Sequence, residues 1–162
     1  MVFDASTLIL LAKAEILALV LKEKKGVVTP EVWREIQRGK GPDVRPLTYF
    51  QELGEIRIMD AGRPGMLQKL KKDFNLAGGE ASSLVLAKEK NATLATDDRL
   101  AIRACKVLGI PFATAIHFLI WLRRKDKISV NNALTTLEKL TQFGRYQETI
   151  VNDAREKLKG GI

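Results

Sequence analysis

Short runs of apolar residues alternate with longer amphipathic runs along this chain, and the alternation predicts strands that are each followed by a helix. The predicted strands are Val2–Phe3, Gly26–Val28, Glu55–Ile58, Ala92–Ala95 and Ile110–Ala113. The predicted helices are Ser6 to about Lys24, Thr29–Ile36, Leu47–Leu53, Met66–Phe74, Glu80 to about Lys90, and Asp98–Leu108. Such alternation is typical of a parallel sheet covered by helices on both faces. We therefore expect an α/β fold.

The remainder of the chain, from Ala115 to Leu158, has a helical pattern with breaks near Lys127 and Gly144. A chain of 162 residues with 46% hydrophobic residues has the length and the apolar content of one domain. We expect residues 1–126 to form that domain, 127–159 to form a helical extension packed on it, and 160–162 to form a flexible tail.

The composition adds a basic charge balance and a single cysteine. The chain has 27 Lys and Arg against 19 Asp and Glu, a formal net charge of +8. A positive field attracts polyanions, so nucleic acid is the expected class of partner. Cys105 is the only cysteine, so an internal disulfide and a multi-cysteine zinc site are excluded. A single cysteine also suits a reducing cytoplasm. The apolar stretch Leu8–Leu21 is interrupted by charged residues, so we expect neither a signal peptide nor a membrane span.

Acidic residues stand where the predicted sheet would bind a ligand. Asp4 directly follows the first strand, and Asp97 and Asp98 follow the fourth. Glu35 lies in the helix after the second strand, and Glu80 starts the helix before the fourth. Ligands of parallel sheets bind beyond the carboxyl ends of the strands. If the first and fourth strands are neighbours, these acids converge on one crevice, although each alone also fits a role as a helix cap or a dipole partner.

Carboxylates that share one crevice repel each other unless a cation neutralises them. Hard divalent cations such as Mg²⁺ prefer oxygen ligands, and they activate water and stabilise charge on a phosphodiester. The acids therefore predict a metal site, which also removes the objection that an acidic pocket repels RNA.

Basic residues flank the acids on two predicted helices. Arg99 and Arg103 lie four residues apart, on one helix face beside Asp98, and Arg34 and Arg38 repeat the spacing near Glu35. A solvated helix face is the ordinary role of such residues. Their position beside the acids favours contacts with RNA phosphates.

Four ordered motifs resemble those of PIN-domain nucleases, in particular the prokaryotic branch that includes the VapC-type toxins. The motifs are Val2–Ile9, Thr29–Ile36, Gly78–Ala81 with Leu84–Ala87, and Ala95–Arg99, and they span roughly residues 2 to 116. In the family's pattern the acidic positions fall on Asp4, Glu35, Glu80 and Asp98. The doubled acid leaves Asp97 as a possible partner or substitute. Ser6 and Thr96 match polar positions that support the ligands or water around the metal.

The resemblance implies a three-layer α/β/α fold with a parallel sheet of about five strands. It also implies hydrolysis of RNA by metal-activated water, with Mg²⁺ or Mn²⁺ as cofactor and a 5′-phosphate and a 3′-hydroxyl as products. The ligands it implies are Asp4, Glu80 and Asp98, with Asp97 as a partner of Asp98 or a substitute for it. Many relatives are homodimers, and the toxins are inhibited by an antitoxin protein. The segment after Lys127 is longer than in a minimal PIN domain.

Other functions are less consistent with the residues. A phosphoacceptor receiver domain has its acidic pair after the first strand, whereas here the pair follows the fourth. No Gly-x-x-x-x-Gly-Lys-[Ser/Thr] sequence exists, so a P-loop NTPase is excluded. His117 is the sole histidine and is interpreted as a helix residue, and Cys105 as a packed one. A catalytically inactive PIN-like module that binds RNA or protein remains the alternative.

Overall fold

The central sheet has five parallel strands in the order β3-β2-β1-β4-β5. In the computed structural model, which describes residues 1–39 and 41–160, they are β1 (Val2–Phe3), β2 (Gly26–Val28), β3 (Ile56–Ile58), β4 (Leu94–Ala95) and β5 (Phe112–Ala113). The strand β1 lies in the middle and pairs with β2 on one side and β4 on the other. The first and fourth strands are therefore neighbours, as the convergence of the acids requires.

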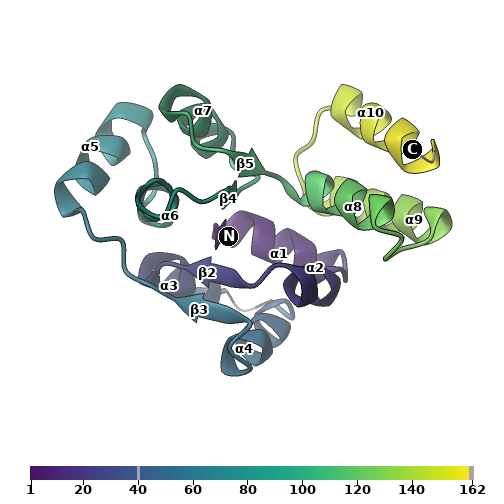
Figure 1. The fold of residues 1–162 in the computed structure, drawn as a ribbon, viewed down its shortest axis with the longest axis horizontal. Coiled ribbons are helices and arrows are strands. Elements are labelled where there is room, and N and C mark those ends of the chain that lie inside the picture. Colours follow the sequence, from purple (N-terminus) through teal and green to yellow (C-terminus); the bar gives the residue numbers. More distant parts are fainter. Residues whose placement is uncertain (40, 161–162) are drawn as a thin grey trace.

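Helices cover both faces of this sheet (Figure 1). In the described part of the chain they are α1 (Ala5–Lys13), α2 (Leu17–Glu23), α3 (Pro30–Arg38), α4 (Val44–Glu52), α5 (Pro64–Phe74), α6 (Gly78–Glu89), α7 (Arg99–Leu108), α8 (Ala115–Arg124), α9 (Val130–Phe143) and α10 (Glu148–Lys159). Helices α5, α6 and α7 lie on one side of the strands, and α1, α2, α8 and α9 lie on the other. The predicted three-layer α/β/α fold is confirmed.

Alternating side chains of the strands divide the core between the two faces. Phe3 packs in one apolar cluster with Val28, whereas its neighbour Val2 packs in a second cluster with Leu94. This separation follows from strand geometry, because successive side chains point to opposite faces of a sheet. The ring of Phe3 also stacks on Phe118 of α8, with the centroids 5.6 Å apart. Both faces are apolar, as expected for a buried parallel sheet.

Several predicted helix boundaries differ from the structure; α4, for example, begins at Val44 and not at Leu47. The helix expected from Ser6 to Lys24 is two helices, because Glu15 adopts a left-handed φ of 61° and turns the chain between α1 and α2. The helix expected to begin at Glu80 begins at Gly78, so both glycines lie in its first turn. Apolar periodicity continues across the break at Glu15, and this is why the pattern alone did not reveal it.

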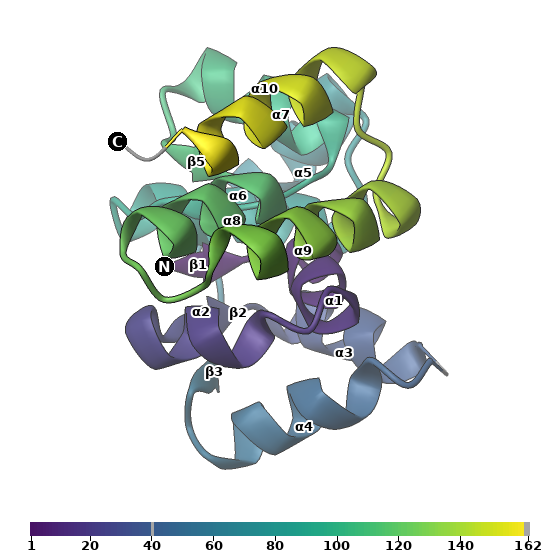
Figure 2. The ribbon, with the colours of Figure 1, turned by 90° about the vertical axis from the view of Figure 1, so that its right-hand side faces the viewer.

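The C-terminal helices pack on the same core as the sheet. Leu137 and Leu140 of α9 and Leu158 of α10 are buried in the cluster that contains Phe3. Figure 2 shows α8, α9 and α10 side by side on the face that is turned to the viewer. Helix breaks occur near Lys127 and Gly144, as predicted. The boundary between residues 126 and 127 stays a prediction, and residues 161–162 of the predicted tail lie outside the described residues.

None of the helices within residues 1–39 and 41–160 is long and apolar enough to cross a bilayer.

We expect Leu137→Ala to destabilise the whole molecule by about 2–5 kcal/mol, because a fully buried leucine is lost from the shared core. The measurement is urea unfolding followed by far-UV circular dichroism and by the fluorescence of Trp33 and Trp121. Asn131→Ala, at an exposed position of α9, is the matched control. Two separate transitions, with only the second shifted by Leu137→Ala, would show that the extension unfolds independently.

Candidate active site

Asp4 is a buried carboxylate at the end of the central strand. It is 2% exposed and forms the N-cap of α1, where Oδ1 accepts a hydrogen bond from the Ala5 backbone N–H at 2.8 Å. Oδ2 accepts two more, from the hydroxyls of Ser6 and Thr96, both at 3.0 Å. Thr96 directly follows β4, and the pairing of Phe3 with Ala95 brings it beside Asp4. The two predicted supporting residues therefore both hold Asp4.

Burial raises the pKa of Asp4 to about 7, because desolvation disfavours the charged form. The hydrogen bonds from Thr96 and Ser6 lower this pKa, and the negative charge of Glu80 raises it further. The three hydrogen bonds thus compensate only part of the cost of burial. At neutral pH, Asp4 without a cation is close to the midpoint of its titration.

Glu80 lies among other acids in the first turn of α6. Its pKa is raised by burial and by the charges of Asp98 and Glu35, while a hydrogen bond from the Ala77 backbone N–H at 2.7 Å lowers it. Since Glu80 also acts on Asp4, the charges of all four predicted catalytic acids are linked through Glu80. Glu80 is therefore near enough to Asp4, Glu35 and Asp98 for their charges to interact, although the four acids come from separate segments of the chain.

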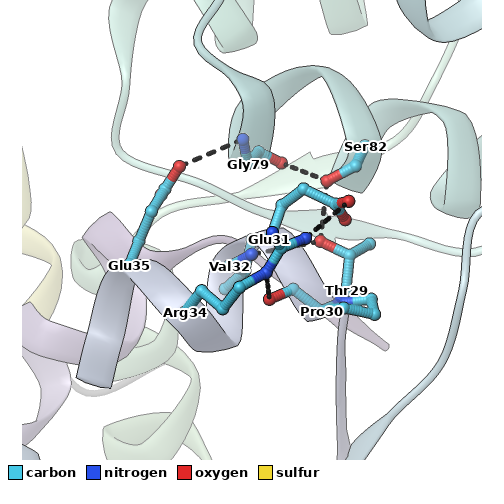
Figure 3. A network of polar contacts seen from close by, with 8 residues as sticks. All are labelled: Thr29, Pro30, Glu31, Val32, Arg34, Glu35, Gly79 and Ser82. Atoms are coloured by element: carbon cyan, nitrogen blue, oxygen red, sulfur yellow. Dashed lines mark hydrogen bonds and ion pairs between the residues drawn. The ribbon is translucent and has the colours of Figure 1, made fainter. Parts of the chain in front are cut away.

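Glu35 reaches this region because α3 packs against α6. Its Oε1 accepts a hydrogen bond from the Gly79 backbone N–H at 3.1 Å (Figure 3). A Cβ atom on Gly79 would lie 2.5 Å from Oε2 of Glu35, so only glycine leaves room for the carboxylate. Beside this contact, the hydroxyls of Thr29 and Ser82 form a hydrogen bond at 2.7 Å and hold the two helices together.

Asp98 binds the start of α7 through only one of its oxygens. Oδ1 accepts hydrogen bonds from the backbone N–H groups of Leu100 and Ala101, both at 2.8 Å. This is the ordinary geometry of an N-cap. Within residues 1–39 and 41–160, no hydrogen bond falls on Oδ2. Asp98 therefore combines a structural role with a free acceptor beside Glu80.

Asp97 faces in a different direction from its neighbour Asp98. Its carboxylate accepts hydrogen bonds from the Thr7 hydroxyl at 2.6 Å, from the Ala115 backbone N–H at 3.0 Å and from the Tyr146 hydroxyl. Burial raises the pKa of Asp97, while the bonds from Thr7, Tyr146 and Ala115 lower it. Its role as a metal ligand stays a prediction, and a cation there competes with these donors. No sequence pattern indicated Tyr146.

The four predicted RNA-binding arginines are all exposed. Arg34 forms an ion pair with Glu31 at 3.1 Å on the same helix and donates to the Pro30 carbonyl (Figure 3). Arg99 and Arg103 lie one turn apart on α7, directly after Asp98. Arg38 is in the last turn of α3. Contact of these residues with RNA stays a prediction.

The single histidine and the single cysteine have structural roles. Nδ1 of His117 accepts a hydrogen bond from the Thr114 backbone N–H at 3.0 Å, which completes a capping box at the start of α8. Cys105 is fully buried, and burial raises the pKa of its thiol to about 11. A thiol with this pKa is protonated at neutral pH and is a poor nucleophile.

Carboxylates are the ligands that hard divalent cations prefer, but these acids do not form a complete ligand set in the structure. In the described part of the chain, no three acidic, histidine or cysteine side chains stand close enough to hold a metal ion. Mg²⁺ commonly uses one or two carboxylates and keeps several waters. Burial raises the pKa values of Asp4 and Glu80, so both groups favour the neutral form, and a bound cation would stabilise their charged forms. The residues therefore fit such an ion.

The family of the chain follows from a match over nearly its full length. The family model described as "PIN domain" (DUF3368) matches residues 1–159. The chain belongs to the PIN-domain family. The PAE2754 protein of Pyrobaculum aerophilum has a similar solved structure, with a TM-score of 0.52 and 18% identity over 75% of this chain and 94% of that one. A comparison with curated proteins finds no match.

Membership of the PIN-domain family gives the acids a general context. PIN domains are generally nucleases and generally use divalent metals. In this PIN domain, the acids that the motifs select are the four whose charges are linked through Glu80. The structural similarity to PAE2754 supports the fold alone.

The raised pKa of Asp4 predicts how the stability of the metal-free PIN domain depends on pH. An unfolded chain titrates Asp4 near 3.8, whereas the folded chain titrates it near 7. Between these pH values the folded state binds the proton of Asp4 more tightly than the unfolded state does. The contribution of the protonated Asp4 to the free energy of unfolding is therefore complete below about pH 4 and is lost as the pH rises to about 7.

We therefore expect the stability of Asp4→Asn in EDTA, relative to the wild type, to increase by roughly 2–3 kcal/mol between pH 5 and pH 8. Asparagine keeps the bond from the Ala5 N–H and carries no charge. The measurement is urea unfolding of both proteins at several pH values, with Asp126→Asn, at an exposed position, as control. A stability difference that does not grow between pH 5 and pH 8 contradicts the raised pKa.

Proposed function

We propose that this PIN domain is a divalent-metal-dependent ribonuclease that hydrolyses RNA phosphodiester bonds at the acidic cluster. The observation that supports this most is the buried carboxylate of Asp4, whose pKa is raised to about 7 beside a second raised acid, Glu80. A fold does not keep such uncompensated charge in its interior without a cost in stability. Functional sites are where perturbed acids of this kind gather.

The acids have different roles in the proposed reaction. Asp4 and Asp98 would hold the cation, because Asp4 is fixed by three hydrogen bonds and, among the described residues, no hydrogen bond falls on Oδ2 of Asp98. Glu35 or Glu80 orients the attacking water and receives its proton. A bound divalent cation supplies Lewis acidity to the phosphodiester and lowers the pKa of water. The products are a 5′-phosphate and a 3′-hydroxyl.

One observation favours a second function, that of a catalytically inactive module that binds RNA or protein. Within residues 1–39 and 41–160, no three potential ligands stand at metal-binding distance from a common point. An inactive module retains the basic surface but has no need for a complete ligand set. A cleavage assay separates this alternative from the ribonuclease.

The predicted partners and cellular role also belong to this proposal. The resemblance to VapC-type proteins suggests a toxin of a toxin–antitoxin pair, an inhibitory antitoxin and a homodimer, and the single cysteine suits a cytoplasmic location. The net charge of +8 supports an RNA partner. The toxin role, the antitoxin, the homodimer and the cytoplasmic location stay predictions.

We expect purified protein to cut a mixed RNA pool in Mg²⁺ or Mn²⁺ and not in EDTA, and Asp98→Asn to lower the rate by roughly a hundredfold or more. Asparagine retains the N-cap of α7, so folding is preserved. Asp126→Asn, which removes the same charge from an exposed position, is the control. RNA that is retarded on a gel but remains intact with every metal supports the inactive module instead.

The pair of glycines in α6 provides a test of the position of Glu35. We expect Gly79→Ala to lower cleavage roughly tenfold or more, because the new Cβ displaces the Glu35 carboxylate. Gly78→Ala is the matched control, since a Cβ there has no atom within 4 Å. Initial rates and urea midpoints are measured for both. Equal rates for the two variants mean that the contact of Glu35 with Gly79 has no part in catalysis.

A further inference from the structure

A cleft of about 640 Å³ lies between α7 and the C-terminal extension. It is bounded by α7, by the end of β5 and start of α8, and by residues 145–153 at the start of α10. In Figure 1, α7 and α10 lie to either side of β5. Asp97 and Arg99 line this α7–α10 cleft, and they flank Asp98 in sequence. The cleft therefore begins next to a proposed catalytic acid.

Three cations line the cleft: Arg99 and Lys106 from α7, and Arg145 from the loop before α10. All three are exposed, and among the described residues none of them forms a salt bridge. The two acids of the lining are already engaged: Asp97 accepts its hydrogen bonds, and Asp153 pairs with Lys157 at 2.7 Å. The lining thus has three cations against two acids, and Lys106 also lies over the ring of Phe112, 6.0 Å from its centroid.

The same cleft contains apolar and aromatic surface. Ile102, Phe112 and Ile150 line it, and Ile150 is 46% exposed although it is a large aliphatic side chain. The rings of His117 and Tyr146 also contribute, with His117 edge-on to Phe112 at 6.4 Å between centroids. Bases of single-stranded RNA stack on such rings, and phosphates bind Arg and Lys.

We propose that the α7–α10 cleft binds a nucleotide of single-stranded RNA that flanks the bond cut at the acidic cluster. This inference rests on the proposed ribonuclease function and adds a substrate-binding site built by the C-terminal extension. The cleft volume lies within the range of about 300–1,000 Å³ that holds small ligands. It therefore suits one nucleotide with its phosphate and not a duplex. An acidic peptide also satisfies the cations, but the exposed side chains of His117 and Ile150 and the half-buried ring of Tyr146 match a base.

The test measures the binding of a fluorescein-labelled single-stranded RNA octamer by anisotropy, in EDTA and in the Asp98→Asn background, so that nothing is cut. We expect Arg145→Glu to weaken binding roughly tenfold and to reduce its salt dependence. Lys125→Glu reverses one charge at an exposed position outside the cleft, and we expect it to change the affinity less than roughly twofold. Lys106→Glu provides a second variant from the opposite wall if Arg145→Glu does not fold.

The variant Ile150→Ala separates recognition of the base from electrostatic attraction of the phosphates. Ile150→Ala leaves the cations in place, so we expect weaker binding of the RNA octamer and unchanged binding of inorganic polyphosphate. Equal loss for both ligands, or no loss for RNA, overturns the nucleotide site. If Arg145→Glu and Lys106→Glu bind RNA as tightly as Lys125→Glu, the inference is also wrong, and an acidic peptide becomes the remaining occupant.

The outcome is distinguishable from failure of the proposed function. If the RNA pool is never cut but Arg145→Glu still loses affinity, the cleft binds RNA and the ribonuclease proposal fails. If RNA is cut with metal but all cleft variants bind normally, the ribonuclease proposal stands and the cleft has no part in RNA binding.

Discussion

The acidic cluster is built around one carboxylate, Asp4, that is buried at the end of the central strand. Removing the charge of Asp4 from water costs free energy, and the fold returns part of this cost through hydrogen bonds from Ala5, Ser6 and Thr96. The remaining part appears as a pKa of about 7. An apolar residue at this position would avoid the cost altogether. The chain therefore gives up stability at the point where β1 enters α1.

The strand order determines which residues share this edge of the sheet. Since β1 lies between β2 and β4, the segments that follow β1 and β4 leave the sheet side by side. This is the switch point at which parallel sheets commonly bind ligands. Glu35 and Glu80 do not follow a strand directly. They reach the edge because α3 and α6 are joined by the contact of Thr29 with Ser82 and of Glu35 with Gly79.

The sequence was informative where a local rule fixes the geometry. Strands, most helices and the acids after β1 and β4 follow from periodicity and from the position of a residue relative to its strand. The motif pattern selected Glu35 and Glu80. Their position relative to each other depends on the tertiary contact of Glu35 with Gly79, which no local rule describes. The break at Glu15 was missed because apolar residues continue on both sides of it.

The doubled acid shows the same limit more clearly. In the sequence, Asp97 and Asp98 are equivalent neighbours, and the choice between them came only from the family's motif. In the structure they have different partners, because the extended backbone before α7 turns Asp98 toward the helix N-terminus and Asp97 toward Thr7 and Ala115. Tyr146, distant in the sequence, completes the surroundings of Asp97.

These contacts also explain how the C-terminal extension relates to the acidic cluster. The carboxylate of Asp97 binds α1 through Thr7, the start of α8 through Ala115, and the loop before α10 through Tyr146. Asp98 is the next residue along the chain. The turn that carries one proposed metal ligand is therefore fixed by three elements, one of which belongs to the extension. The extension is thus part of the support of the acidic cluster as well as one wall of the α7–α10 cleft.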